Sequence, residues 1–184
     1  MALLAFNAVM LSLAIALVTR VMLDAFGKRP MPPFIRTRQA VAVEAAEAFG
    51  PIPPGSVVYD LGAGDGRMLR TIAAQNPGSS YIGIELRRFP FLLGRLKGLF
   101  LRPRISLVRG SLFAQDLGDA THIYTYLYPW VMEELLPKLE REVRPGTTLI
   151  SLDFPFPNRE AQVVIPLRAA RTHRLGKSLN VYTF

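Results

Sequence analysis

The feature that most constrains the fold is the run of residues 57–67, VVYDLGAGDGR. A short apolar stretch typical of a buried strand carries Asp60 near its carboxyl end, and glycines follow at 62, 64 and 66 before a helical pattern begins. Glycine adopts positive φ without penalty and lets backbone approach a ligand, while the first turn of a helix presents free N–H groups. The run therefore predicts a strand, a glycine turn and a helix within an α/β sheet, with a small ligand bound at the turn.

The segments on either side continue this alternation. Strands are predicted at residues 56–60, 81–85, 105–109, 122–127, 147–154, 163–167 and 179–184, and helices at 37–49, 66–75, 89–99 and 130–143. The last two strands are expected to form a closing antiparallel hairpin. The expected fold is thus α/β, with a mostly parallel seven-stranded sheet and flanking helices. A chain of 184 residues has room for one such domain.

The amino-terminal segment has a different character. Residues 2–18 contain no charge, and the run extends to Leu23 with Arg20 as its only charged residue. At about 1.5 Å per residue, 17 to 22 residues span roughly 26 to 33 Å, which brackets the hydrocarbon thickness of a bilayer. We therefore predict a transmembrane anchor over 1–23, a linker over 24–36 and the α/β domain over 37–184. A helix buried against the domain is the alternative.

Basic residues follow the apolar segment rather than precede it, which favours an uncleaved anchor over a signal peptide. The positive-inside rule then predicts a single-pass membrane protein with its N-terminus outside and its domain in the cytoplasm. The whole chain carries 22 Lys and Arg against 14 Asp and Glu, a net charge of +8 that favours anionic partners. Because the basic segment 87–109 is interleaved with Leu and Phe, we expect membrane lipid there rather than nucleic acid, with a solvated basic helix as the alternative.

The residue types limit the chemistry. No cysteine and only two isolated histidines argue against a metal site or a thiol nucleophile. A dinucleotide fingerprint, G-x-G-x-x-G, would place its third glycine at position 67, which is arginine. The observed pattern D-x-G-x-G-x-G, from Asp60 to Gly66, instead resembles motif I of the class I S-adenosylmethionine-dependent methyltransferases, which implies a Rossmann-like fold.

This resemblance implies roles for individual residues around an S-adenosylmethionine cofactor. Asp60 would orient the methionine amino group, and Glu85, 19 residues after Gly66, would accept hydrogen bonds from the ribose hydroxyls. The backbone of the loop would pass under the ligand. Relatives usually carry Asp or Asn at the position of Ser111, so adenine recognition would rely on this hydroxyl and on main-chain groups near Leu112. The expected cofactor-binding residues are Asp60, Gly62, Ala63, Gly64, Gly66, Glu85, Ser111 and Leu112.

A second group of residues suggests the acceptor. Tyr126, Tyr128 and Pro129 end a predicted strand beside the expected cofactor site, where aromatic faces attract a sulfonium or methylammonium cation. They are the predicted catalytic residues, with ordinary strand aromatics as the alternative.

The order of motifs is similar to the family of lysine methyltransferases that includes the enzyme acting on the c-ring protein of mitochondrial ATP synthase, and its small prokaryotic relatives. The motifs are Pro33-Phe34, the run from Asp60 to Arg67, residues 83–86 (GIEL), 110–113 (GSLF), Tyr128-Pro129, 144–146 (RPG) and Phe154-Pro155. The resemblance implies methyl transfer from S-adenosylmethionine to a protein lysine, with a membrane-associated protein as the expected substrate. A small-molecule or lipid amine methyltransferase and a non-catalytic cofactor-binding scaffold remain as alternatives.

Overall fold

The computed structural model describes residues 2–26, 35–169 and 175–184, and the chain divides into two compact units, 1–33 and 34–184. The first unit holds one helix, α1 (Ala2–Phe26). Among the described residues, no helix combines the length and the hydrophobicity that crossing a bilayer requires. The transmembrane helix predicted over 1–23 is therefore not supported. The predicted linker 24–36 overlaps the end of α1, and its residues 27–34 lie outside the described part of the chain.

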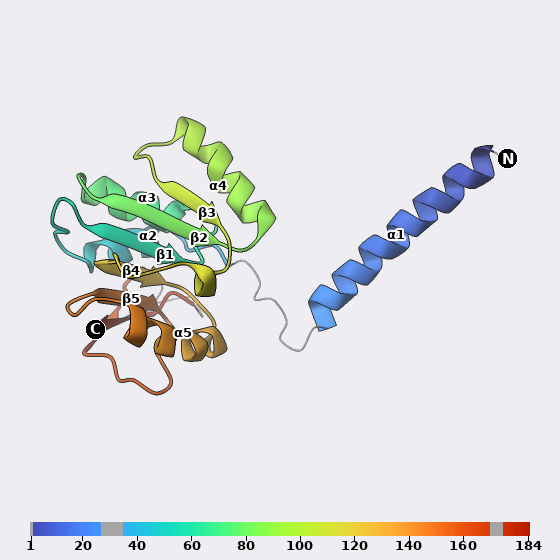
Figure 1. The fold of residues 1–184 in the computed structure, drawn as a ribbon. Helices are drawn as coiled ribbons and strands as arrows, with labels where there is room; N and C mark the ends of the chain where they lie inside the picture. The colour runs from blue at the N-terminus through green and yellow to red at the C-terminus, as the bar shows by residue number, and fades with distance from the viewer. Residues whose placement is uncertain (1, 27–34, 170–174) are drawn as a thin grey trace. The chain divides into compact units, whose positions relative to one another are not determined.

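The second unit is built on one seven-stranded sheet (Figure 1). Its strands are β1 (Val57–Leu61), β2 (Ser80–Glu85), β3 (Ser106–Arg109), β4 (His122–Thr125), β5 (Thr148–Leu152), β6 (Val163–Pro166) and β7 (Ser178–Thr183). The order is β3-β2-β1-β4-β5-β7-β6. The first five strands are parallel, β7 is antiparallel to β5, and β6 is antiparallel to β7. The predicted mostly parallel sheet and its closing antiparallel pair are confirmed.

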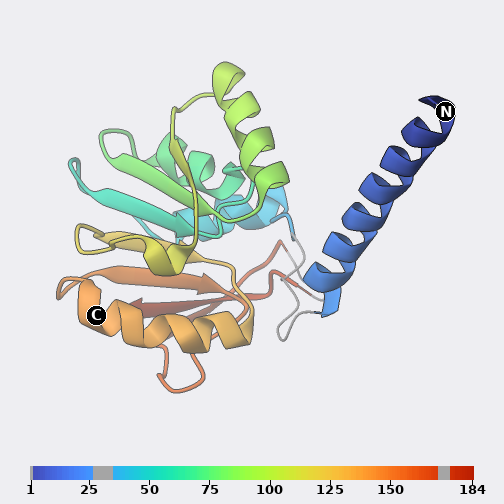
Figure 2. The same ribbon diagram turned by 45° about the vertical axis from the view of Figure 1, so that its right-hand side comes forward.

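Helices cover both faces of this sheet, as Figures 1 and 2 show from two directions. They are α2 (Gln39–Glu47), α3 (Arg67–Gln75), α4 (Arg88–Phe100) and α5 (Pro129–Glu142). Neighbouring strand residues point to opposite faces. Val58 of β1 accordingly belongs to one buried cluster with α2 and α3, whereas Tyr59 belongs to a second cluster with α5. These two apolar layers hold the sheet rigidly between helices.

Strand register brings the carboxyl ends of three parallel strands together. Asp60 of β1 pairs with Gly83 of β2 on one side and with Tyr124 of β4 on the other. Glu85 is the last residue of β2, so its side chain starts at the same edge of the sheet as Asp60. In parallel α/β sheets this edge is where ligands bind.

Two predicted strands end earlier than expected. β4 stops at Thr125 rather than at 127, and α5 begins at Pro129, whose missing N–H and fixed φ suit the first turn of a helix. β5 stops at Leu152 rather than at 154 because Asp153 has a φ of 61°, outside the strand region. The carboxylate of Asp153 accepts hydrogen bonds from the backbone N–H groups of Gly176 and Lys177, each at 2.6 Å. This contact turns the chain away from the sheet.

Candidate active site

The glycine loop after β1 is folded tightly against the end of β2. Gly62 and Ala63 both donate their N–H groups to the carbonyl of Ile84, at 2.9 and 3.0 Å. Gly62, Gly64 and Gly66 have φ values of 91°, 57° and 74°. A Cβ on Gly66 would lie 2.5 Å from Cδ1 of Ile105, so both conformation and space require glycine there. The loop therefore needs its glycines in order to form, and Gly62 is its exposed residue at this edge.

Glu85 holds this loop and the start of α4 with one carboxylate. Its Oε2 accepts from the N–H of Gly64 and its Oε1 from the N–H of Arg87, each at 2.7 Å. Glu85 is buried. Each carboxylate oxygen has a second lone pair, so the group can still accept hydrogen bonds from two hydroxyls. This matches the predicted contact with the two ribose hydroxyls of the cofactor.

Two further acids lie near Glu85, and their environments differ. Burial, followed by the charges of Glu85 and Asp65, raises the pKa of Asp60 to about 8. Burial also acts to raise the pKa of Asp65, but Lys97 and Arg36 outweigh it and lower that pKa overall. The Arg36 guanidinium lies 2.9 Å from the Asp65 carboxylate, and Lys97 forms a second ion pair with it. Asp60 is therefore the acid at this edge that a bound cation would stabilise most.

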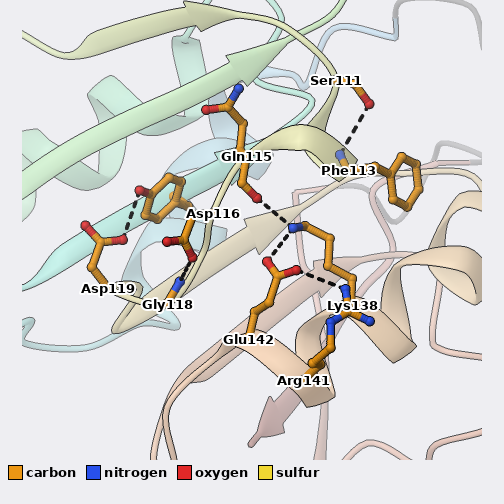
Figure 3. A network of polar contacts seen from close by, with 10 residues as sticks. Ser111, Phe113, Gln115, Asp116, Gly118, Asp119, Lys138, Arg141 and Glu142 are labelled. Carbon is orange, nitrogen blue, oxygen red and sulfur yellow. Dashed lines mark hydrogen bonds and ion pairs between the residues drawn. The ribbon is translucent and has the colours of Figure 1, made fainter.

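The loop after β3 carries the predicted adenine-side residues. Ser111 Oγ accepts from the N–H of Phe113 at 3.3 Å, which caps a short 3-10 helix, η1 (Leu112–Ala114). Figure 3 shows how α5 supports this loop through Lys138, which donates to the carbonyl of Gln115 at 2.6 Å and pairs with Glu142. Lys138 is buried, so this contact fixes the loop firmly. The Ser111 hydroxyl thus already has a structural function at the position predicted to face adenine.

The same network connects the loop to the sheet. Tyr59 of β1 donates its hydroxyl to Asp119 at 3.0 Å. The N–H of Gly118 donates to Asp116 at 2.8 Å (Figure 3). Burial and the nearby Asp119 raise the pKa of Tyr59 to about 12, so the hydroxyl stays protonated and keeps donating. The loop that follows β3 is held from both β1 and α5.

The predicted catalytic residues form part of an aromatic stack. Phe154 lies between Tyr126 and Tyr128, with ring centroids 6.0 and 5.9 Å away and planes inclined by 15° and 16°. Trp130 extends the stack from Tyr128 at 4.6 Å. Pro129 is placed differently, because it is not an aromatic member of the stack and forms the first residue of α5. Tyr126 and Tyr128 are thus brought together by their shared contact with Phe154.

Two hollows meet at Tyr126. One is lined by Asp60, Gly62, Ala63, Gly64 and Tyr126 among others, and has a volume of about 40 Å³. The other has a volume of about 290 Å³ and is lined by Tyr126, Val41 and Leu152 among others. Both are also lined by residues 35–37, which precede α2. A group held over the glycine loop and a group entering the larger hollow would therefore face each other across Tyr126.

Some residues of this site were not predicted. Phe154 was noted only within a Phe-Pro pair, although it occupies the middle of the stack. Residues 35 and 36 were assigned to the linker, although Ile35 and Arg36 line both hollows. Arg36 and Lys97 were not linked to Asp65, because ion pairs between such distant positions leave no local pattern in a sequence.

The site suits the chemical groups of S-adenosylmethionine. A buried Asp60 with a raised pKa favours a cationic ammonium beside it, since an opposite charge restores the ionised carboxylate. Glu85 has free lone pairs for hydroxyl donors, and the backbone of the exposed Gly62 carries no side chain at this edge of the sheet. Together with the strand order and the antiparallel β7, these features define a class I S-adenosylmethionine-dependent methyltransferase.

The chain belongs to the ANTKMT methyltransferase domain family, whose sequence profile matches residues 60–163. It is 33% identical over 127 residues to a protein-lysine N-methyltransferase of Saccharolobus islandicus (strain REY15A), an alignment that covers 68% of this chain and 78% of that protein. It is 32% identical over 115 residues to the adenine nucleotide translocase lysine N-methyltransferase of Mus musculus, covering 61% of this chain and 49% of the mouse one. S-adenosylmethionine is accordingly its cofactor.

A solved structure agrees with this assignment. The RNA methyltransferase from Salinibacter ruber, in complex with S-adenosyl-L-homocysteine, superposes with a TM-score of 0.69 at 27% sequence identity. The match covers 81% of this chain and 93% of the other. The predicted fold class, enzyme class and cofactor are thereby confirmed, whereas the individual site residues remain predictions.

Proposed function

We propose that this enzyme transfers a methyl group from S-adenosylmethionine to the side-chain amine of a lysine on a membrane-associated protein. The observation that carries the proposal is the meeting of the two hollows at Tyr126. At about 40 Å³ the hollow over the glycine loop has room for only one end of the cofactor, beside Asp60, and the larger apolar hollow suits the four-carbon stem of a lysine. The relatives named as lysine methyltransferases support the choice of acceptor.

The reaction needs a neutral amine in line with the methyl group. The lysine nitrogen forms a bond to the methyl carbon while the bond from carbon to sulfur breaks, leaving S-adenosylhomocysteine and a methylated amine. The ammonium proton must first leave to water, and desolvation among aromatic rings favours this by lowering the lysine pKa. Burial and Asp153 raise the pKa of Tyr126 above its ordinary value. Tyr126 therefore stays a neutral phenol that orients the amine and does not remove its proton.

The proposed membrane location has its own support. Residues 2–18 carry no charge, and the described side chains of α1 are exposed, including Phe6, Leu11, Leu13 and Leu17. Exposed apolar side chains around a helix require lipid or protein to cover them. We propose that this segment attaches the enzyme to a membrane, with the domain on the cytoplasmic side.

Methyl-group tracing tests the acceptor. Purified enzyme is incubated with methyl-labelled cofactor and with membranes from a strain that lacks the enzyme, and label is then measured in protein, lipid, small molecules and RNA. Label in protein that yields methyl-lysine on hydrolysis supports the proposal. Label in lipid or small molecules would indicate an amine methyltransferase of another kind, and label in RNA would indicate the acceptor named for the Salinibacter ruber protein. No label despite intact cofactor binding would indicate a scaffold.

A truncation tests the membrane location. Deleting residues 1–23 should move the enzyme from the membrane to the soluble fraction, with cofactor affinity unchanged because the glycine loop belongs to the other compact unit. Fractionation and calorimetric titration measure the two outcomes. A truncated chain that stays soluble but does not bind cofactor would show that the amino-terminal helix is part of the domain.

A further inference from the structure

The outward face of α4 is apolar. Phe89, Leu92, Leu96 and Leu99 recur at helical spacing and are 57 to 73% exposed. The opposite face of the helix packs on the domain through Pro90 and Gly94, which are buried. Most exposed large apolar side chains in residues 35–169 and 175–184 lie between residues 86 and 108. α4 lies at the outside of the domain in both ribbon views (Figures 1 and 2), and its Leu and Phe side chains are therefore among the exposed apolar groups of the domain.

Positive charge surrounds this apolar face. Residues 87–109 contain seven basic residues and no acidic residue. Arg88 and Arg95 are exposed on α4 itself, beside the apolar row. Lys97 is used differently, because it is paired with Asp65 inside the domain. An apolar row with arginines on its flank is the pattern of a helix that lies in the interface of an anionic bilayer.

We propose that α4 is a bilayer-docking surface, with Phe89, Leu92, Leu96 and Leu99 entering the acyl boundary and Arg88 and Arg95 contacting anionic headgroups. Charge argues against a second copy as the occupant. A two-fold contact through α4 would bring the same unopposed arginines of two copies together. An anionic membrane offers the opposite charge and an apolar layer at the same time.

This surface is also well placed for the reaction. α4 begins three residues after Glu85, at the edge of the sheet where the cofactor loop lies. A docked α4 would therefore hold the active site near the bilayer surface, within reach of a lysine at the membrane boundary. The inference rests on the proposed membrane location and deepens it. The experiment below measures membrane contact of α4 and not methyl transfer, so a negative result would not argue against lysine methylation.

A single-cysteine probe can report on α4, because the chain contains no cysteine. An environment-sensitive dye is attached to L96C of the full chain, and to N158C as the control, since Asn158 is exposed on the loop between β5 and β6. Both proteins are mixed with phosphatidylcholine vesicles, with or without phosphatidylglycerol, whose acyl chains carry bromine as a quencher. We expect strong quenching of the Leu96 dye only with phosphatidylglycerol, and little quenching of the Asn158 dye.

Charge neutralisation provides the second measurement. Arg88→Gln with Arg95→Gln should lower the ratio of docked to undocked α4 by about 25-fold, at about fivefold for each charge removed. Calorimetric affinity for S-adenosylmethionine should not change. Equal quenching at both positions, or no dependence on phosphatidylglycerol, would overturn the proposal. A Leu96 dye that is already shielded before vesicles are added would also overturn it, because protein would then cover this face.

Discussion

Asp60 makes the ligand-free enzyme less stable as pH rises. Its pKa is 3.8 in an ordinary environment and about 8 in the fold, because of burial and of the neighbouring Glu85 and Asp65. Between these values the folded chain holds a proton that the unfolded chain has released. The stability from this proton is fully present below pH 3.8 and is lost as pH rises through about 8. At about 1.36 kcal/mol per pH unit, the loss between pH 5 and pH 7 is about 3 kcal/mol.

Asp60→Asn removes this titration, because the amide is neutral in both states. We expect the variant to gain stability relative to the wild type by about 3 kcal/mol between pH 5 and pH 7, measured by urea unfolding without cofactor. Glu160→Gln, at an exposed position on the loop after β5, is the control and should give a flat difference. Parallel pH profiles for Asp60→Asn and the wild type would refute the reasoning.

Cofactor binding should offset the loss of stability that an ionised Asp60 causes. An ammonium beside Asp60 stabilises the ionised carboxylate, so binding below pH 8 releases a proton. Wild-type affinity for S-adenosylmethionine should therefore rise about tenfold from pH 6 to pH 7, and the affinity of Asp60→Asn should be low and independent of pH. Calorimetry in buffers of different ionisation enthalpy measures the affinity and the proton release together.

Substitutions at three further positions separate the parts of the site. Gly64→Arg should abolish cofactor binding and lower the unfolding midpoint, because the side chain enters the hollow over the loop and the φ of 57° at this position favours glycine; wild-type affinity in calorimetry would contradict this. Glu85→Ala should weaken binding roughly 10- to 150-fold, for about 1.5 to 3 kcal/mol of lost hydrogen bonding. Glu85→Gln should weaken cofactor binding as much as Glu85→Ala, because its NH₂ group must face the N–H of Gly64 or of Arg87. A change in binding free energy of less than about 0.5 kcal/mol for both variants would exclude the ribose contact. Tyr126→Ala should raise KM for a lysine substrate about 2- to 10-fold by loss of the stack on Phe154, whereas Tyr126→Phe keeps the ring and should have a KM close to that of the wild type. Equal KM values for Tyr126→Ala and the wild type would argue against a role for stacking.

Local patterns predicted the alternation of strands and helices, because each depends on hydrophobic period and on glycine or proline within a few residues. The glycine spacing and the acids of β1 and β2 likewise appear in order along the chain. The early end of β5 could not be predicted from local patterns, because Asp153 turns the strand through contacts with Gly176 and Lys177, more than twenty residues away. Phe154 between two tyrosines depends on the same turn, so its place in the stack could not be read from spacing.

The carboxylate of Glu85 joins the cofactor loop to the start of α4, which the ion pair between Lys97 and Asp65 also connects. One oxygen holds the cofactor loop at Gly64, and the other holds Arg87 immediately before α4. A shift of α4 on a bilayer would thus reach the ribose position through one side chain. Such thermodynamic linkage is reciprocal: if docking tightens cofactor binding by some factor, the bound cofactor tightens docking by the same factor. Release of S-adenosylhomocysteine after the reaction would then weaken the binding of α4 to the membrane, and undocking of α4 would weaken cofactor binding by the same factor.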